Sequence, residues 1–524
     1  MYIAPDSIIT ILKDIPLDNT YTNTLYFASA SAQSSYFASK AKYTFSNYTY
    51  LRKEQVIRVE TKADNLYDCN YIMFKNTSYG NKWFYAFITN VEYVNNEQAN
   101  ISYEIDVMQT WAFDYTIHPS LVVREHPLTD VVGDNLQPEG LETGTYVARR
   151  WDATGHLTNY KIIVACTFDK EYNDSAGGEY GNIYSGLSLN AFDTPEEVNT
   201  FIDGAQNRAK TDGIVSVFMM PGDFVVGKGE ALKTYELPFI RRVSDIDGYA
   251  PNNNKLFTYP YNYLYVTNLT GNSAEYKYEF FSGDVGSSVK FLLAMNMSCN
   301  PEAVLVPLNY KGLVANYNEK LVIGDYPICS YNTDTFKAFL ANSVVSTGTG
   351  LASTFASATL TRDSAILKAS SAATAAGAGA ALLGGSIGLA AIGAGAAVGA
   401  ATLLAKATYE AFQPPISNGS QGSSAMLSLA VKDFAFIPVS ITSEFAKVID
   451  GYFDVYGYAT NEVKIPNTHS RKHWNFVLLQ NPSITGSIPA GDMGKIKAIF
   501  SNGITFWKNG SEVGHYELAS DNKA

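Results

Sequence analysis

Apolar and polar residues alternate along several stretches of the chain. Between residues 101 and 107 the order Ile-Ser-Tyr-Glu-Ile-Asp-Val places every second side chain on an apolar face. Residues 81–107 contain two such stretches joined at residues 95–97, and residues 276–280 repeat the alternation. A period of two predicts strands with one face in water. Pro and Asn clusters between residues 248 and 268 extend the prediction of short strands and loops to the middle of the chain.

Two stretches carry apolar residues at helical spacing instead. Residues 193–213 begin with Asp-Thr-Pro-Glu-Glu and end on Gly, which are signals that start and stop helices. Residues 490–500 place Met493, Ile496, Ile499 and Phe500 on one face. Near the C-terminus, Asn509-Gly510 lies between strand-like runs and predicts a hairpin. We therefore expect a mainly β protein with a few short helices.

One region departs from this pattern. Near Phe339 the tyrosines give way to Ala, Gly, Ser and Thr, and strand-like composition returns only after Gln421. Because β-type sequence flanks the region on both sides, we interpret it as an insertion, a long apolar and helical loop. Between Lys337 and Lys406 the charged residues are Arg362, Asp363 and Lys368.

The centre of the insertion, Ala369–Ala405, consists of 37 uncharged residues. About 20 residues span a bilayer as a helix, and a helix of this length would reach about 55 Å. One span with a tail, or a bent hairpin, therefore fits better than one straight span. Its large apolar residues favour insertion by only roughly 4 kcal/mol in total, and each glycine costs about 1 kcal/mol in a helix in water. This balance indicates a conditional membrane segment, not a permanent anchor.

Two other interpretations of the insertion stay open, a flexible linker and a buried core helix. Its large apolar residues are too many for a Gly/Ser linker. Gly384–Gly388 and Gly395–Gly399 both have the G-x-x-x-G spacing that lets helices approach closely in lipid. The predicted membrane-insertion residues are Leu382, Leu383, Gly384, Ile387, Gly388, Leu389, Ile392, Gly395, Val398, Gly399, Leu403 and Leu404. The flanking basic residues predicted to contact anionic headgroups are Lys337, Arg362, Lys368 and Lys406.

Net charge and amino-acid composition exclude some classes of function and favour others. The net charge of −12 argues against stationary nucleic-acid binding, which needs a basic face. Low charged content with 36 tyrosines favours strands and large contact areas. No signal peptide is evident in MYIAPDSIIT. The four cysteines form no paired motif and are expected to be buried thiols: Cys69, Cys166, Cys299 and Cys329.

Motifs for catalysis are few. The six histidines show no metal spacing, Gly227-Lys228-Gly229 lacks the rest of a phosphate loop, and no nucleophile elbow is present. Asp245 and Asp247 could begin a calcium loop, but the downstream ligands of an EF-hand are absent and a solvated turn fits better. Two carboxylates could still meet in space as a glycosidase pair. We expect no enzyme, no cofactor and no metal site.

Several phrases outside the insertion, taken together, carry a resemblance to a known family. FYAFITNVEYV is followed by EIDVMQTW and FDYTIHPSLVVREHP. Later come DGYAPNNNKLFTYPYNYLYVTN, VPLNYKG, YPICSYNTDTFKAFLANS and GDMGKIKAIFSNGITFWKNG. In this order, from about residue 20 to residue 507, they resemble the tail knob (distal tail tube) protein of phi-29-type short-tailed phages. The match is weakest between about residues 130 and 235.

The resemblance implies a β-rich protomer, six copies of which form a tube with β-barrel or sandwich-like domains. It implies a hydrophobic loop, here about residues 342–421, that closes the tube and then emerges to form a pore in the host cytoplasmic membrane, through which DNA passes. The implied partners are five further copies, other tail or collar proteins, the host membrane and phage DNA in transit. The implied location is the distal end of the virion tail, and the host membrane during infection.

The composition and the resemblance together predict a division into five parts. Two alternative functions stay open: a purely structural tube or adaptor with the loop as an inert plug, and a tail enzyme that degrades the cell wall. The predicted parts are a β tube domain in residues 1–125, an inserted knob or lower region in 126–250, a β domain in 251–340, the membrane-active loop in 341–421, and the C-terminal part of the β tube domain in 422–524.

Overall fold

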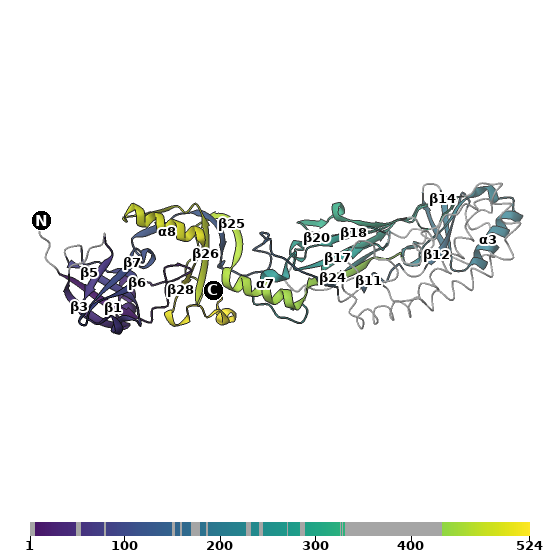
Figure 1. Ribbon diagram of the computed structural model, residues 1–524. Helices are drawn as coiled ribbons and strands as arrows, with labels where there is room; N and C mark the ends of the chain where they lie inside the picture. The colour runs from purple at the N-terminus through teal and green to yellow at the C-terminus, as the bar shows by residue number, and fades with distance from the viewer. Residues whose placement is uncertain are drawn as a thin grey trace. The chain divides into compact units, whose positions relative to one another are not determined.

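The computed structural model describes a mainly β chain with a few short helices (Figure 1), as the alternating pattern predicts. The predicted membrane-active loop lies outside the described residues. The described residues are 6–48, 54–77, 80–148, 152–157, 160–168, 179–184, 187–226, 232–239, 245–269, 271–282, 289–324, 326, 328–330 and 432–524.

The chain divides into two compact units, and each is assembled from separated stretches of sequence. Unit 1 consists of residues 1–141, 251–255 and 447–524. Unit 2 consists of residues 142–250 and 256–446. The five-part division expected from the sequence is finer than these units and stays a prediction.

Unit 1 contains two main sheets and one small strand pair. Sheet A has, in spatial order, β3 (Ala41–Tyr48), β1 (Ser7–Lys13), β5 (Cys69–Asn76), β6 (Phe84–Asn95), β7 (Gln98–Ile105) and β4 (Val56–Val59). Sheet B has β2 (Asn23–Leu25), β28 (Ile504–Trp507), β26 (Trp474–Gln480), β9 (Ser120–Glu125) and β25 (Tyr458–Lys464). The small pair joins β8 (Tyr115–Ile117) to β27 (Ile484–Gly486).

The predicted hairpin of alternating strands is confirmed in sheet A. β6 and β7 pair in antiparallel fashion on either side of residues 96–97. Along β7, residues 99, 101, 103 and 105 are buried and the residues between them are not. The buried face packs against β9, β26 and β28 of sheet B and against helix α8 (Ala490–Asn502), which confirms the second predicted helix.

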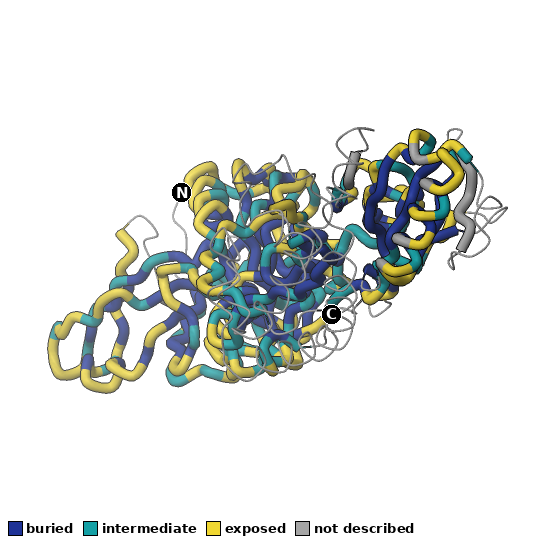
Figure 2. Tube along the Cα trace, turned by 90° about the vertical axis from the view of Figure 1, so that its right-hand side faces the viewer, coloured by how far each residue is buried: buried dark blue, intermediate teal, exposed yellow. Residues whose placement is uncertain are grey.

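A second core of unit 1 is rich in aromatic side chains. It contains Phe37 of helix α1 (Ala30–Ser39) together with Trp474 and Trp507, whose ring centroids lie 4.9 Å apart. Beside it begins the short helix α2 (Val107–Thr110), which Asp106 caps by accepting hydrogen bonds from the amides of the next turn. Figure 2 shows the buried residues in dark blue, gathered inside the described parts of the chain, with exposed residues in yellow around them.

Unit 2 is built from three sheets. Sheet D has β10 (Tyr146–Ala148), β24 (Ala435–Ile441), β17 (Asn262–Thr267) and β18 (Ser273–Tyr276), and β11 (Asp152–Ala153) also pairs with β24. Sheet E has β13 (Glu179–Tyr184), β14 (Leu187–Phe192), β12 (Tyr160–Cys166), β15 (Ile214–Pro221) and β23 (Ile328–Ser330). Sheet G has β16 (Thr234–Phe239), β19 (Val289–Met295), β20 (Ala303–Tyr310) and β21 (Leu313–Ala315), and β22 (Leu321–Ile323) also pairs with β20.

The three sheets of unit 2 share one apolar core. Phe218 of sheet E, Leu264 and Phe436 of sheet D, and Phe291 of sheet G are all fully buried in it. The other face of sheet E is covered by helix α3 (Pro195–Asn207), and this confirms the helix predicted between residues 193 and 213. Unit 2 is therefore a layered β structure with one helical cover.

The sequence pattern did not predict helix α7 (Ser443–Tyr456). The backbone amide of Phe445 is hydrogen-bonded to the Thr442 hydroxyl, and Glu444 occupies the first turn, a favourable place for negative charge. The helix ends at Gly457, whose amide donates to the Phe453 carbonyl from a left-handed conformation (φ 64°). These signals were available in the sequence, but the surrounding strand-like composition concealed them.

Three further predictions need correction. Asn509-Gly510 does not form a hairpin: the Asn509 side chain accepts from the Ser511 amide and starts a 3₁₀ helix. Residues 276–280 are not one strand, because β18 ends at Tyr276 and a 3₁₀ turn follows. Cys69 and Cys166 are buried as expected, but Cys299 is only half-buried.

The described residues also form short 3₁₀ helices. These are η1 (Ala63–Leu66), η4 (Thr211–Gly213), η5 (Gly222–Phe224), η6 (Asn254–Phe257), η7 (Tyr278–Phe280), η8 (Tyr317–Glu319), η11 (Gly510–Glu512) and η12 (Tyr516–Asp521).

Candidate functional site

The predicted membrane-insertion residues between Leu382 and Leu404, and the flanking basic residues between Lys337 and Lys406, lie outside the described residues, so their roles stay a prediction. The structure does describe the two strands that border the insertion. β23 ends at Ser330 on one side, and Lys432 is the first described residue on the other. We call β23, together with the segment from Lys432 into β24 (Ala435–Ile441), the stem of the insertion.

The two sides of the stem differ in their place in the fold. Among the described residues, β23 lies at the edge of sheet E, where it pairs with β15. β24 lies inside sheet D, where it pairs with β17 along one side and with β10 and β11 along the other. The chain therefore returns from the insertion directly into an interior strand, which fixes that side of the stem firmly.

Two buried charged residues secure the returning side. The Lys432 ammonium donates to the Gly324 carbonyl and lies 4.5 Å from the ring centroid of Tyr326. Asp433 accepts from the Thr154 hydroxyl and, at 2.8 Å, from the amide of Phe434. Lys432 and Asp433 are only 1% and 5% exposed. Because buried charges are costly unless they are paired, these contacts hold the chain in one position just before β24.

A second cluster of buried charges lies in unit 1. The Glu139 carboxylate pairs with both the Arg124 guanidinium and the Lys255 ammonium, and it accepts from the Ala459 amide at 3.0 Å. The side chains of Glu139 and Lys255 are 1% and 4% exposed. Burial lowers the pKa of Lys255, and the neighbouring Glu139 acts in the opposite direction. One carboxylate therefore joins the end of β9 to the isolated segment 251–255.

Two carboxylates of α7 hold the same segment. Asp450 accepts from the amides of Asn252 and Asn253 at 2.7 and 3.0 Å. Asp454, one helical turn later, accepts from the side-chain amides of both asparagines. Burial raises the pKa of Asp454, and the charge of Asp450 raises it further. These bonds explain why residues 251–255 belong to unit 1 although unit 2 residues flank them in the sequence.

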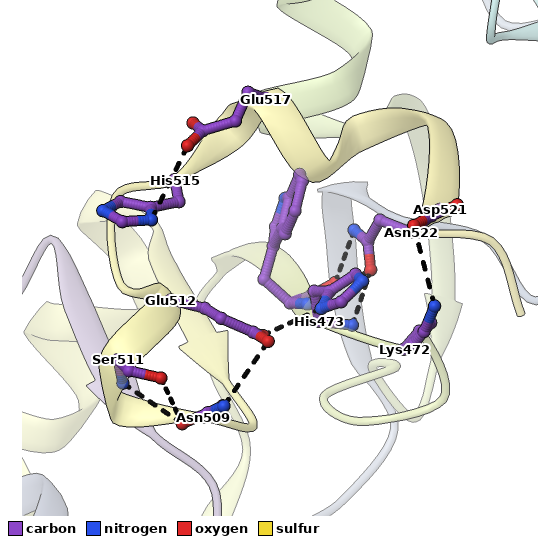
Figure 3. A network of polar contacts seen from close by, with 10 residues as sticks. Lys472, His473, Asn509, Ser511, Glu512, His515, Glu517, Asp521 and Asn522 are labelled. Atoms are coloured by element: carbon purple, nitrogen blue, oxygen red, sulfur yellow. Dashed lines mark hydrogen bonds and ion pairs between the residues drawn. The ribbon is translucent and has the colours of Figure 1, made fainter.

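The pair formed by His473 and Glu512 in unit 1 is not an accessible catalytic site. His473 Nδ1 lies 2.8 Å from the Glu512 carboxylate (Figure 3), a geometry that can orient a general base. However, His473 is 8% exposed, and its Nε2 is buried without a hydrogen-bond partner. The Asn522 side chain binds the backbone of His473 and Trp474 in the same network. This network fastens the C-terminus to β26.

Unit 1 also has a groove of about 490 Å³ beside β25. Its wall contains the apolar side chains of Leu128, Leu136 and Ile465 and the charged ones of Asp134 and Glu462. Within the described ranges, no three His, Cys, Asp or Glu side chains converge to hold a metal ion. In the same part of the chain, no helix combines the length and the apolar character needed to cross a membrane.

Comparison with known proteins identifies the class. A family described as "Bacillus phage phi29, Tail knob protein gp9, C-terminal domain" matches residues 231–523, and one described as "Caudoviral major tail protein N-terminus" matches residues 5–116. Because the first match covers more than half of the chain, the protein belongs to the phi29 gp9 family of phage tail knob proteins. The resemblance inferred from the sequence is thus confirmed, and it makes the chain a component of the virion tail.

Individual relatives agree with this class. The chain is 26% identical to "Tail knob protein gp9" of Bacillus phage B103 and 25% identical to the protein of the same name from Bacillus phage phi29, with 98% of both chains covered in each case. Among solved structures, the bacteriophage C1 tail knob protein gp12 matches with a TM-score of 0.61 at 15% identity, over 98% of this chain and 99% of that chain. This last likeness concerns the fold alone.

Proposed function

We propose that six copies of this chain form the knob and distal tube of a phage tail, closed by the apolar insertions. On contact with the host, the insertions leave the tube and form a pore in the cytoplasmic membrane for genome ejection. The observation that best supports this proposal is the uncharged stretch Ala369–Ala405, which lies within the sequence of a tail knob family member. Lipid is a better solvent than water for such a stretch, so its transfer is favourable once a membrane is within reach.

The stem suits this function mechanically. Lys432 and Asp433 hold one end of the insertion against sheet D, so the segment can move outward while it stays attached to its knob. The G-x-x-x-G positions would let six such segments approach one another closely in lipid. Lys368 and Lys406, which flank the uncharged stretch, would then contact anionic headgroups.

The charge of the chain suits passage of DNA. Each copy carries a net charge of −12, so a ring of copies repels phosphate and does not retain the genome. We propose no catalytic role, in keeping with relatives that are named as tail knob proteins. Other tail or collar proteins are the proposed neighbours within the virion.

A vesicle leakage assay tests the pore. Purified full-length protein, titrated over a range of pH, is expected to release dye from anionic vesicles, and a variant without residues 345–420 is not. A double variant, Ile387→Glu with Ile392→Glu, places charge in the apolar centre and is expected to reduce leakage at least tenfold. Val463→Glu adds one charge at a position that is 72% exposed in unit 1 and is the matched control. Equal leakage from full-length and deleted protein would reject the pore and leave the inert plug.

Electron microscopy of negatively stained protein tests the assembly. We expect six-fold rings with a central opening, and the deletion variant should form the same rings with a wider opening. Monomers at micromolar concentration would contradict the hexameric tube. Release of soluble fragments from intact cell wall by the purified protein would support a wall-degrading enzyme instead.

A further inference from the structure

The groove beside β25 exposes three large aliphatic side chains of unit 1. Leu128, Leu136 and Ile465 line it and are 64%, 43% and 65% exposed. Aliphatic side chains scattered singly over a surface carry no message, but a group of them around one groove marks an interaction site. All residues that line the groove belong to unit 1 and to the described ranges. The groove is therefore an open, partly apolar surface.

Hydrogen bonds hold both walls of the groove in place. In the segment after β9, the Asn135 side chain donates to the Thr129 carbonyl at 3.3 Å. On the other wall, the Asn467 amide donates to the Glu125 carboxylate at 2.7 Å. A preformed groove does not have to be ordered by its ligand, so less of the binding energy is lost in ordering it.

Strand β25 offers a backbone edge beside the groove. It is the last strand in the spatial order of sheet B, where it pairs with β9, and no described strand pairs with its other side. Residues 461–463 are exposed in succession, so neither face of this part of the strand is covered. An edge strand presents a row of amides and carbonyls with which an added strand can pair. β25 therefore combines a free edge with an adjacent apolar groove.

Negative charge is in excess along the groove, because three carboxylates and one ammonium line it. The Lys464 ammonium lies 2.8 Å from the buried Glu125 carboxylate and 3.7 Å from that of Glu462, which is 65% exposed. Asp134 is exposed as well. The chain as a whole carries a net charge of −12, so a second copy would bring like charge to the groove. Charge complementarity instead favours a basic segment of a different protein.

We infer that the groove binds an extended, basic and aliphatic segment of a different protein, which adds a strand to β25. Main-chain hydrogen bonds supply affinity in this mode, and pockets for alternate side chains supply specificity. Side chains of an added strand alternate between its two faces, so one set can reach the aliphatic side chains of the groove and the other can reach Asp134 and Glu462. The inference goes beyond the proposed pore, because the groove contains no residue of the insertion.

Fluorescence anisotropy with the full-length protein tests this binding. The probe is a fluorescein-labelled peptide in which valine and lysine alternate. Two comparison peptides carry glutamate in place of lysine, or serine in place of valine. We expect the valine–lysine peptide to bind at least about tenfold more tightly than either, because each comparison lacks the charge or the apolar contact. No saturable binding, or equal affinity for the valine–lysine and valine–glutamate peptides, would overturn the inference.

Charge variants assign the binding to the groove. Asp134→Asn with Glu462→Gln should weaken binding of the valine–lysine peptide about tenfold. Glu60→Gln with Glu97→Gln removes two exposed carboxylates elsewhere in unit 1, so it has the same net charge and is the matched control. The control should bind as the native protein does. Equal losses in the two double variants would indicate attraction to the chain as a whole and would overturn the inference.

Hydrogen exchange locates the added strand. At saturating peptide, the amides of residues 461–465 should exchange at least about tenfold more slowly. Those of β4, an edge strand of sheet A, should not change. Protection that omits β25 would contradict the addition of a strand there.

Sedimentation velocity separates a different protein from a second copy as the occupant. Leu136→Ser with Ile465→Ser removes two exposed aliphatic side chains of the groove and should weaken peptide binding about tenfold. The same variant should keep the oligomeric state of the native protein. A smaller assembly would assign the groove to a contact between copies and would overturn the inference. Loss of vesicle leakage bears only on the pore, since the peptide assay does not involve the insertion.

Discussion

The two units of this chain are stabilised by different interactions. Unit 1 draws together three separated stretches of sequence and joins them through buried charges, with Glu139 paired to Arg124 and Lys255. Unit 2 packs three sheets on one apolar core. Its ion pair Lys290–Glu236 lies at the surface, with side chains about half exposed, and its buried charges Lys432 and Asp433 lie at the stem of the insertion.

The difference matters because different substitutions destabilise a buried ion pair and an apolar core. A buried ion pair needs each partner, so the loss of one member leaves an uncompensated charge. An apolar core depends instead on the area that its side chains bury. Unit 1 should therefore be sensitive to charge substitutions, and unit 2 should be sensitive to changes at the border of its insertion.

The largest effect is expected for Glu139→Gln in unit 1. The substitution keeps the shape but leaves Arg124 and Lys255 buried without their shared carboxylate, at a cost of about 3–5 kcal/mol. Urea unfolding followed by tryptophan fluorescence measures it, because four of the five tryptophans lie in unit 1. Glu462→Gln is the control: its side chain is 65% exposed, and a change below about 0.5 kcal/mol is expected. Similar losses for both variants would contradict the importance of buried charge.

The second-largest loss of stability is expected for Gly457→Ala at the end of α7. A Cβ atom there would lie 2.2 Å from the Glu125 carbonyl oxygen, so the backbone of β9 must move, and we expect a loss of about 3 kcal/mol or more. Gly140→Ala has the same φ of 64° but open space around its Cβ, and only the cost of the left-handed conformation applies, about 1–2 kcal/mol. Equal losses for the two variants would show that strain and not close packing governs the position.

A pH-dependent effect is expected at Asp106, which caps α2. Burial raises its pKa from 3.8 to about 6, against the hydrogen bonds from Tyr71 and from the amides of Gln109 and Met108. The folded chain therefore keeps this proton to higher pH than the unfolded chain does. Its stabilising contribution is complete below about pH 4 and is lost as the pH rises through 6, by about 2–3 kcal/mol.

Asp106→Asn should remove that loss. The amide oxygen can still accept from the backbone of α2, so the variant isolates the titration from the cap. Unfolding in urea at pH 4, 5, 6 and 7 should show that the variant gains on the native chain as the pH rises. A constant difference across this range would exclude titration of Asp106.

In unit 2, Thr154→Val tests the stem. It removes the hydroxyl that donates to the buried Asp433 and should cost about 1–3 kcal/mol. Hydrogen exchange of peptides from β11 and β24 provides the measurement, since local opening should increase there first. Thr234→Val, at an exposed position on β16, is the control and should change exchange in neither strand. No change in either variant would show that Asp433 does not fix the border of the insertion.

The smallest effect is expected for Asn509→Ala, which removes the cap of η11. The loss should be about 0.5–1 kcal/mol, and Asn509→Asp, which keeps an acceptor oxygen, should lose less. Thermal unfolding can resolve the order of the three proteins. If Ala and Asp variants are equally stable, the 3₁₀ start at this position contributes nothing measurable.

The sequence predicted those strands and helices whose formation is decided by residues close together in the chain. β7 alternates because one of its faces is buried along its whole length, and α3 follows Thr-Pro-Glu-Glu, so both could be predicted from a short window. The hairpin at Asn509 was wrong because distant contacts decide the path there: Asn522 binds the backbone of Trp474 and draws the last residues onto β26.

For the candidate site, the sequence reveals the insertion but not its stem. An uncharged stretch is visible in composition alone. The roles of Lys432 and Asp433 depend on Gly324 and Thr154, which are far away in the sequence, and a lysine beside an aspartate carries no local signal for burial. The partnership of Glu139 with Lys255 escaped prediction for the same reason.

The discontinuity of unit 1 has a consequence for synthesis of the chain. β2 pairs in parallel with β28, so Asn23 meets its partner Thr505 only when the ribosome has almost finished. The described strands of unit 2 are complete by Ile441. Unit 2 can therefore fold while unit 1 is still open.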